Sequence, residues 1–521
     1  MIYGSSQRRF GLSYGEKEHI DLKRILSFAV SIVLCLGALA ESYQITDVQY
    51  DLDGRTKPYA LNKALDIRTD TVFNSKEELN LYIDFITQKV NDQRVLENSQ
   101  VSYQVGLPNE QGIAPVTLFI AADETWNILP LPYPKYNSNS GFSLKLKVKD
   151  YNFLGSMQPL NFDLEFYQED EGTTNVLGLG FDFSIPFAIG PADAQWSNDI
   201  SADYKFGDTR PSFSFSTGLD LSYAFKYVVL QLEADQAFDI DPDYREAGDE
   251  FYAKEYLKLS APVTLLRTTS LLGNLVFAPH VSLTYYWDAD GINHEDLIGP
   301  SVGLGYALTI GQVNWYGNFR KGITTSFTHS YEYNFESTDW TTALALEFQG
   351  FYFINAVGLT TRSKIFTHYD PIQGKNTTTT NVANWLRGVY DSSDYNEGRA
   401  DMSSGFVLNL DFPIKIVQTD WLGWGKALFK RSMPSWFGIF DFELQLAPFI
   451  DIALYGADDY CLFHLDDGFY AAGLEVIVYP TKMRSIQVRA SAGMDLGAKL
   501  LKHDWRSKRG LEIEFGIGLH Y

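Results

Sequence analysis

Short segments of alternating apolar and polar residues run from Phe142 to the end of the chain, separated by Gly, Asp, Asn and Pro. Successive side chains of a β-strand point to opposite faces, so this alternation predicts strands that each have one apolar and one polar face. Clear examples are 142–148, 176–183, 213–219, 281–285 and 342–348. The length of the region suits on the order of 16 strands of about ten residues each, and the number expected between 142 and 366 is ambiguous by about two.

The preceding region, 43–123, has a different pattern, which predicts a small α+β domain. Ser75 and Glu78 have the spacing of a helix-capping box, and apolar residues then recur at intervals of three and four. Pro58 is well placed at the start of an earlier helix. The expected elements are, in order, a strand at 44–50, a helix from Pro58, a helix after Ser75, and strands at 101–107 and 116–120. The resulting order is β-α-α-β-β.

Residues 124–141 are predicted to connect these two regions. The segment contains Pro130, Pro132 and Pro134. Proline fixes the backbone and lacks an N–H group, so it interrupts helices and central strands. We therefore expect a short, rigid connector, with the strand-rich region beginning at residue 142.

The long uncharged apolar run of the chain extends from Ile25 to Ala40, and two basic residues precede it. A basic start, an apolar centre and a small-residue ending are typical of a secretory signal peptide, and the run is too short for a comfortable transmembrane helix. Residues 1–40 are therefore expected to be removed from the mature protein. Cys35 permits an alternative interpretation as a lipoprotein cysteine, but apolar residues continue past it and no small residues precede it.

The composition favours a membrane protein over a soluble one. Mean hydropathy is only −0.16, but aromatic residues make up 15% of the chain, which suits a barrel with aromatic girdles. A closed barrel pairs its backbone donors and acceptors between strands, so it can cross lipid without a long apolar run. The formal net charge of −23 argues against nucleic-acid binding. Cys461 would be the remaining cysteine after signal cleavage, which excludes an internal disulfide.

A candidate site centres on an Arg-Gly pair, Arg387 and Gly388, within the long polar segment 367–401. An arginine in such a position needs a carboxylate, and Asp411 and Asp451 follow on the next two expected strands. In both strands alternation places the acid on the face opposite the apolar residues. If the apolar faces contact lipid, both acids point into a barrel lumen. A loop folded inward would then place Arg387 between them in charge-assisted hydrogen bonds.

This pattern resembles the signature of the BamA and TamA superfamily, which consists of outer-membrane barrels preceded by POTRA domains. The matching residues are Arg387, Gly388, Tyr390, Asp411, Phe449 and Asp451. The resemblance implies a loop that packs against the two acids inside a barrel of about 16 strands. There are two departures from the family pattern: Val389 precedes the aromatic residue, and Ala453 stands where glycine is usual.

The resemblance extends toward the N-terminus. Region 43–123 is similar to one POTRA domain, with Gly54, Leu61 and Leu65 where that domain usually has its turn glycine and helix leucines. The segment 152–155 resembles the turn that follows the first barrel strand of the family. The expected fold is therefore mainly β: a transmembrane antiparallel barrel, 142–521, preceded by one small POTRA-like domain.

The chain ends on a predicted strand, 511–521, in which every second residue is apolar. This ending looks like the recognition signal by which outer-membrane barrels are themselves inserted. The residues assigned to the signal are Phe515, Ile517, Leu519 and Tyr521. A soluble sandwich can also end in an alternating strand, but rarely with so long an apolar face and an aromatic terminus.

Catalytic motifs are missing from the sequence, which contains no G-x-S-x-G, no H-E-x-x-H and no paired C-x-x-C. His280 and Ser282 share one face of a predicted strand, but alternation makes such coincidences common. We therefore expect no enzymatic activity, no metal site and no cofactor.

The resemblance implies a factor that inserts barrel proteins into the bacterial outer membrane or translocates polypeptides across it. Clients would template on a weak seam between the first strand, 142–150, and the last, 511–521, while the Arg387 loop braces the barrel. The expected partners are outer-membrane lipids, unfolded outer-membrane or secreted clients, and periplasmic or lipoprotein partners that bind the POTRA-like domain. The alternative is a passive pore, or a lipid or solute transporter, with a periplasmic docking domain. A barrel enzyme is a third possibility.

Overall fold

The structure is a computed structural model of the 521-residue chain. It describes residues 42–137, 141–169, 174–207, 210–225, 228–240, 252–268, 272–287, 300–369, 380–382, 385–389, 401–430, 433–455, 465, 468–497 and 511–517. The predicted signal peptide, Tyr390, Cys461, Leu519 and Tyr521 lie outside these residues. Among the residues described, no helix is long and apolar enough to cross a membrane.

The N-terminal elements form a small α+β unit, as predicted. They are β1 (Ser42–Asp53), α2 (Pro58–Leu65), β2 (Val72–Phe73), α3 (Lys76–Asp92), β3 (Leu96–Val105) and β4 (Ile113–Glu124). The four strands make one sheet in the order β2-β1-β4-β3. The two-residue strand β2 is an addition to the predicted β-α-α-β-β order, too short for alternation to reveal it.

The two helices begin where the sequence predicts. Pro58 occupies the first turn of α2, where its missing N–H group costs no hydrogen bond. The hydroxyl of Ser75 accepts the N–H of Glu78 at 3.1 Å, and the Glu78 carboxylate accepts the N–H of Asn74 at 2.8 Å. This reciprocal pair satisfies donors that the first turn of α3 leaves unpaired. The predicted apolar stripe of α3 is buried: Leu79, Ile83, Ile86 and Val90.

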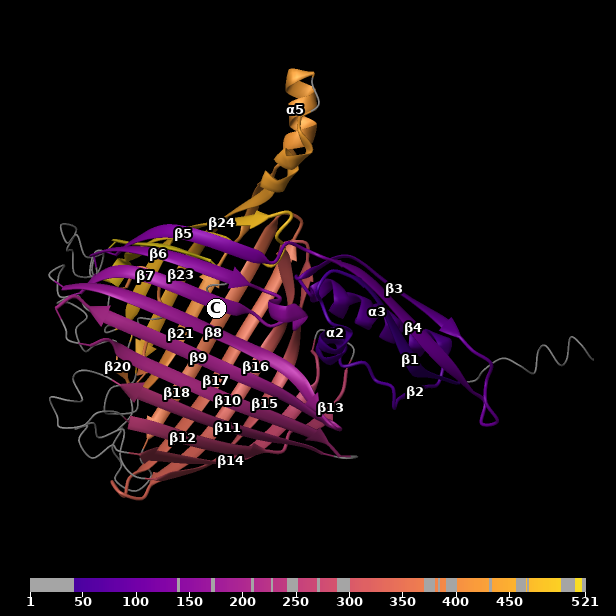
Figure 1. The fold of residues 1–521 in the computed structure, drawn as a ribbon, viewed down its shortest axis with the longest axis horizontal. Helices are drawn as coiled ribbons and strands as arrows, with labels where there is room; N and C mark the ends of the chain where they lie inside the picture. Colours follow the sequence, from indigo (N-terminus) through magenta and orange to yellow (C-terminus); the bar gives the residue numbers. More distant parts are fainter. Residues whose placement is uncertain are drawn as a thin grey trace, which may run out of the picture. The chain divides into compact units, whose positions relative to one another are not determined.

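A closed barrel contains the other long strands (Figure 1). Its first half comprises β5 (Ile128–Asn137), β6 (Gly141–Asp150), β7 (Leu160–Glu169), β8 (Thr174–Ile189), β9 (Ala192–Lys205), β10 (Ser212–Ala224), β11 (Val229–Ile240), β12 (Tyr252–Ser260), β13 (Val263–Leu266) and β14 (Leu275–Trp287). A 3₁₀ turn, η1 (Phe153–Gly155), follows β6. It coincides with the turn that the sequence predicts after a barrel strand.

The second half of the barrel comprises β15 (Ser301–Tyr316), β16 (Phe319–Asn334), β17 (Trp340–Ile354), β18 (Val357–Tyr369), β21 (Ser404–Asp411), β22 (Ile414–Gln418), β23 (Phe442–Tyr455), β24 (Phe469–Pro480), β25 (Val488–Asp495) and β26 (Leu511–Ile517). Two further short strands, β19 (Thr380–Asn381) and β20 (Asp401–Met402), pair with each other between β18 and β21. Five barrel positions follow the Arg387 loop, as the sequence predicts.

Two pairs of barrel segments each occupy a single position. β12 and β13 both pair with β14, and β21 and β22 both pair with β18 and β23. Over the described residues, the twenty barrel segments therefore fill eighteen positions. The sequence suggested about 16, a number of the order usual for such barrels, and β5 is one of the strands that the prediction did not include.

The stretch predicted to be a connector contains β5, which pairs with β6 along its whole length from Ile128 to Asn137 and lies next to β26. The first barrel strand is therefore β5, and the prediction that the strand at 142–150 neighbours the last strand is wrong. Pro130, Pro132 and Pro134 do not prevent pairing because they occupy alternate positions. The backbone N–H and C=O groups of alternate residues point to the same neighbouring strand, so the three positions that lack an N–H lie on one edge of β5. The other edge keeps its N–H donors and can pair with β6.

The two ends of the barrel differ in their connections. At one end, two-residue turns at 190–191, 317–318 and 355–356 join neighbouring strands. At the other end, the intervals between strands include 288–300 and 370–403. The end with short turns also carries α5 (Trp421–Phe429) and a 3₁₀ segment, η5 (Ser435–Phe440), between β22 and β23.

The segment from α5 to η5 was not predicted from the sequence. Alternation placed Phe440 on the same strand face as Phe442, whereas β23 begins at Phe442 and Phe440 ends η5. The apolar residues of η5 happen to continue the two-residue spacing of the strand, so the pattern alone does not mark the boundary. Figure 1 shows α5 extending away from the barrel wall.

Candidate functional site

Arg387 lies between the two acids that the sequence predicts as its partners. Its Nε and Nη2 donate to the two carboxylate oxygens of Asp451 at 2.9 and 2.8 Å, which is a bidentate pair. Its backbone N–H donates to the same carboxylate at 2.9 Å, and Nη1 donates to Asp411 at 2.6 Å. A planar guanidinium is suited to such fork-like contacts, which a lysine cannot reproduce.

The three charged groups are removed from solvent. Arg387 is 2% exposed, Asp411 5% and Asp451 0%, whereas the neighbouring Ile450 is 42% exposed. The alternation along β21 and β23 therefore points the acids to the inside of the barrel and the apolar residues to the outside, as predicted. Burial at this depth is tolerated because each charge has an opposite partner.

The ring of Phe449 contacts the guanidinium group of Arg387. The guanidinium carbon of Arg387 lies 3.7 Å from the centre of the Phe449 ring, within the range of a cation–π contact. Phe449 is two residues before Asp451 on β23, so both side chains point inward from one strand. The structure thus brings together Arg387, Asp411, Phe449 and Asp451 from the predicted set.

Gly388 allows the loop backbone to touch the barrel wall. Its φ is +84°, and a Cβ at this position would lie 2.6 Å from the carbonyl carbon of Gly493 and from the N of Met494. A Cβ on Gly493, in β25, would in turn lie 2.9 Å from the N of Gly388. Two glycines therefore face each other, and each is required by the close approach of the other's backbone.

Two charged residues of the site were missed from the sequence. Glu475, on β24, lies 3.5 Å from Nη1 of Arg387, and Arg489, on β25, donates from Nε to Glu475 at 2.6 Å and also from Nη2. The network therefore joins two guanidinium groups to three carboxylates. Alternation places each residue on the inner face, but it does not tell which residues of different strands lie side by side.

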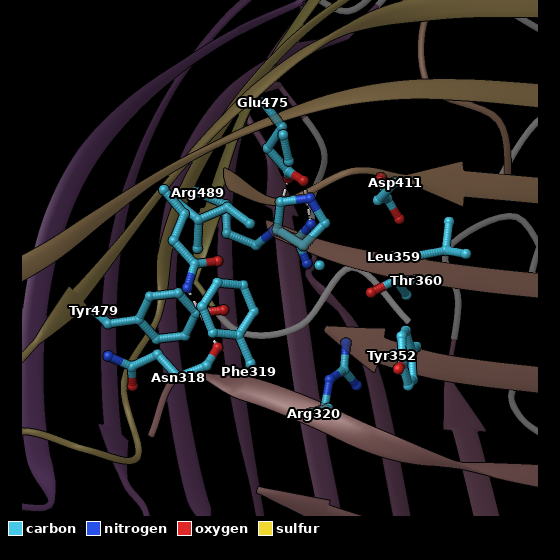
Figure 2. A pocket seen from close by; sticks show the side chains of 15 residues that line it. Asn318, Phe319, Arg320, Tyr352, Leu359, Thr360, Asp411, Glu475, Tyr479 and Arg489 are labelled. Atoms are coloured by element: carbon cyan, nitrogen blue, oxygen red, sulfur yellow. Dashed lines mark hydrogen bonds and ion pairs between the residues drawn. The ribbon is translucent and has the colours of Figure 1, made fainter. Parts of the chain in front are cut away.

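A small cavity lies beside this network (Figure 2). Its volume is about 40 Å³, and its lining includes Arg320, Tyr352, Asp411, Glu475 and Arg489. A space of this size suits water molecules and is too small for a drug-sized ligand. Three of the five charged groups of the network, those of Asp411, Glu475 and Arg489, line this cavity.

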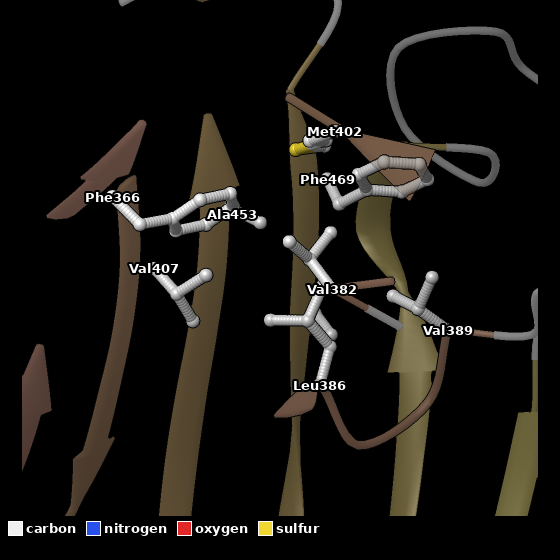
Figure 3. Packing of buried hydrophobic residues seen from close by; sticks show 9 residues of the cluster. Phe366, Val382, Leu386, Val389, Met402, Val407, Ala453 and Phe469 are labelled. Carbon is white, nitrogen blue, oxygen red and sulfur yellow. The ribbon is translucent and has the colours of Figure 1, made fainter. Parts of the chain in front are cut away.

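An apolar cluster holds the rest of the loop (Figure 3). It contains Phe366, Val382, Leu386, Val389, Met402, Val407, Ala453, Phe469 and Ala471. Val389 and Ala453, the two departures from the family pattern, are both buried in it. Both residues therefore have a packing role. The side chain of Val389 fills space on the loop side of the cluster, and the small side chain of Ala453 leaves room for the loop beside β23.

Trp385 adds polar contacts at the edge of this cluster. Its carbonyl accepts the side-chain N–H of Asn409 at 2.8 Å. The cationic groups of Lys364 and Arg362 lie 4.3 and 5.3 Å from the Trp385 ring. Ion pairs, apolar packing and ring contacts therefore all fix the loop to the inner wall.

The other predicted residues are placed only in part. Phe515 and Ile517 lie in β26, which pairs with β25. His280 and Ser282 face β15 opposite Gly305 and Gly303. The partial description of the last strand leaves the insertion signal a prediction.

The fold and the site together define a closed antiparallel β-barrel whose inner wall holds an inward-folded loop through buried ion pairs. Three solved structures are similar to it: CdiB from Acinetobacter baumannii, with 12% identity and a TM-score of 0.47; CdiB from Escherichia coli, with 12% and 0.45; and BamA from Haemophilus ducreyi lacking POTRA domains 1–3, with 11% and 0.33. The matches cover 95%, 88% and 90% of this chain and 81%, 73% and 83% of theirs, respectively.

The sequence itself matches no protein-family model and no curated protein. BamA, named above from sequence motifs, is among the similar structures. Function is therefore argued below from the residues of the chain.

Replacing Arg387 with alanine should strongly destabilise the barrel. The change leaves Asp411 and Asp451 buried without their cation, for which we expect a loss of about 3 to 5 kcal/mol in the free energy of unfolding. Arg387→Lys should lose less, because it keeps the charge but not the two-pronged geometry. Urea unfolding in lipid vesicles, followed by tryptophan fluorescence, measures both.

The matched control is Arg210→Ala, which removes an exposed arginine and should change the free energy by no more than about 0.5 kcal/mol. Equal losses for Arg387→Ala and Arg210→Ala would show that the buried network does not stabilise the barrel.

Gly388→Ala should destabilise the barrel more than Gly190→Ala. Both glycines have positive φ, but a Cβ at Gly190 meets nothing within 4 Å, whereas at Gly388 it meets the backbone of β25. The difference between the two variants therefore isolates the steric contact, for which we expect about 1 to 3 kcal/mol. The same urea titration measures it, and identical midpoints would contradict a tightly docked loop.

Proposed function

We propose that the barrel spans the bacterial outer membrane and that it inserts or translocates polypeptides there, with the α+β unit acting as a POTRA-like domain in the periplasm. The proposal rests on the outward face of the barrel, on the position of the braced loop, and on the edge that β5 presents to β26. The resemblance of the loop motif to the BamA and TamA superfamily supports the same role.

The outward face suits lipid. Exposed apolar residues recur at every second position, as with Leu177 and Leu179 in β8, and Val302 and Leu304 in β15, which are 41 to 59% exposed. An apolar surface of this extent is unfavourable in water and favourable in a bilayer. Closure of the barrel pairs the backbone groups that lipid cannot satisfy.

Aromatic pairs occur near both ends of the strands. Tyr223 and Phe225 lie 4.6 Å apart between ring centres at the end with short turns. Tyr285 and Trp287 lie 4.7 Å apart at the other end. Such rings favour the two membrane–water interfaces, and short turns are typical of the periplasmic side. We therefore assign the end that carries α5 and η5 to the periplasm.

The single observation that carries the polypeptide-handling function is the edge between β5 and β26. Pro130, Pro132 and Pro134 have no N–H to donate, and β5 pairs along its length with β6. The missing donors are therefore turned toward β26, which weakens the ladder that closes the barrel. A poorly paired edge is a template to which another strand can add.

The loop braces the wall up to this seam. Arg387 and Gly388 contact residues of β21, β23, β24 and β25, which are consecutive positions in the barrel. β26 and β5 come next in that order. Opening between them would leave the braced sector intact, so the loop can keep the barrel folded while the seam admits an unfolded outer-membrane or secreted client.

Partners can also add to the α+β unit. β2 and β3 are the edge strands of its sheet, and exposed edges accept an extra strand from another chain. A periplasmic or lipoprotein partner, or the client itself, is the proposed occupant.

The membrane location predicts heat-modifiable migration. The mature protein should fractionate with the outer membrane and migrate faster in gels before heating than after, because the closed ladder resists detergent until heated. Recovery in the soluble periplasmic fraction would refute the location.

Covalent closure of the seam tests the mechanism. In a Cys461→Ser background, one cysteine in β5 is paired with one in β26 whose Cα lies within about 7 Å. Oxidation should abolish insertion of client barrels into the membrane, and reductant should restore it, while solute flux through the lumen stays unchanged. The readout is the amount of folded client per cell.

The matched control locks a ladder that does not need to open. Leu129 and Lys149 are register partners in β5 and β6, so a Leu129→Cys, Lys149→Cys disulfide should leave client insertion intact. If the seam-locked barrel inserts clients as well as the reduced one, lateral opening is unnecessary and a passive pore is the better description.

A further inference from the structure

A hairpin of exposed aromatic residues projects from the end of the barrel that carries the short turns. It is formed by α5 and η5, and we call residues 420–430 and 433–441 the aromatic hairpin (Figure 1). Three of the ten tryptophans in the chain, Trp421, Trp424 and Trp436, lie within it. Trp436 is 53% exposed and Leu428 76% exposed. The charged network and the seam do not involve this segment.

Polar contacts fix the base of the aromatic hairpin to the barrel. Asp441 accepts the backbone N–H of Trp421 at 2.8 Å, and its own carbonyl accepts the N–H of Thr481 at 2.7 Å. Asp420 caps α5 by accepting the N–H of Gly423 at 2.8 Å. The direction in which the hairpin leaves the wall is therefore built into the fold.

The aromatic hairpin lines an open apolar pocket of about 520 Å³. Its lining includes Trp421, Trp424, Leu428, Met433, Phe437 and Phe440, and no lining residue is charged. Gly425 also lines the pocket and is buried, and a Cβ there would overlap the sulfur of Met433. A volume of this size accommodates a ligand rather than a single water.

The pocket continues the outward face of the barrel. Phe442 lines the pocket and is also the first residue of β23, on the same face as the exposed Ile450. On the adjoining strand β22, Ile416 is 55% exposed. The exposed apolar face of β22 and β23 therefore adjoins the pocket.

The opposite face of α5 is basic. At 3.6 residues per turn, Lys426 projects from the side of α5 away from Trp421 and Leu428, and Lys430 follows the helix as its left-handed C-cap residue. Both lysines are exposed. A helix with aromatic residues on one face, a lysine on the other and a second lysine at its end is suited to the membrane interface, where the lysines meet phosphate groups and the rings meet acyl chains.

We propose that the aromatic hairpin is a lipid-binding element, which lies in the periplasmic leaflet and holds an acyl chain of a bilayer phospholipid in its pocket. Continuity with the outward face and the charge of Lys426 and Lys430 identify this occupant over a second copy of the chain or a protein partner. The inference rests on the proposed membrane location and adds to it a lipid site at the barrel's rim.

Photolabelling tests the proposal. The full chain is placed as a single copy in nanodiscs that contain phosphatidylglycerol and a phosphatidylcholine with a photoactivatable diazirine in its acyl chain. Mass spectrometry then maps the labelled peptides. Peptides of the aromatic hairpin should be labelled together with the outward residues Ile416 and Ile450, which report that the barrel itself is in the bilayer.

Pocket variants separate specific binding from mere proximity. Gly425→Leu fills the pocket, and Leu428→Gln makes it polar. Each variant should reduce labelling of the aromatic hairpin about tenfold, because each removes contacts with the acyl chain that are equivalent to burying one apolar side chain. Ala427→Leu is the matched control, since Ala427 does not line the pocket. It should leave labelling unchanged. Labelling of Ile416 and Ile450 should be the same in all four proteins.

Two results would overturn the inference. The first is an unlabelled hairpin in a barrel whose Ile416 and Ile450 are labelled, and the second is labelling that neither pocket variant reduces. Cross-linking of the hairpin to another protein chain in membranes, without lipid labelling, would reassign it as a protein-docking site. An absence of label on Ile416 and Ile450 would instead refute the membrane location, so the two failures are distinguishable.

Discussion

The structure depends on a guanidinium that is almost wholly removed from water. A buried charge is tolerated only when opposite charges and hydrogen bonds replace its hydration, and Asp411 and Asp451 supply them to Arg387. The dependence is mutual, because the acids on β21 and β23 are equally unfavourable without the loop. The loop and the wall therefore stabilise each other, and the glycine contact at Gly388 and Gly493 is possible only in this docked arrangement.

The buried ion pairs hold one part of the barrel wall, and among the described residues the neighbouring part lacks them. The sector from β21 to β25 is held by ion pairs, a cation–π contact and an apolar cluster. The adjoining junction of β26 and β5 has prolines at alternate positions of one strand. The opening that we propose at this junction would be local and would not unfold the barrel, because the free energy of opening depends on the contacts that are lost locally.

The outward surface has its own organisation. Alternating apolar side chains cover the strands, aromatic pairs mark both ends, and the aromatic hairpin extends the apolar surface at the end with short turns. Tryptophans and lysines are the residues that favour the interface, and the hairpin carries both at the periplasmic rim that we propose.

Alternation alone determined which face each strand buries, and so it predicted that Asp411 and Asp451 point inward to Arg387. Local rules also gave the capping box of α3 and the α+β order. The sequence could not reveal Glu475, Arg489 or Gly493 as neighbours of the loop, because register between strands is fixed by closure of the whole barrel. It also misassigned β5, since local rules exclude proline from strands, whereas the tertiary structure turns the missing donors toward one edge. The aromatic hairpin was missed for a related reason: the apolar residues of η5 continue the two-residue spacing of β23, and the sequence does not show that Gly425 packs against Met433, because that contact joins two separate segments of the chain.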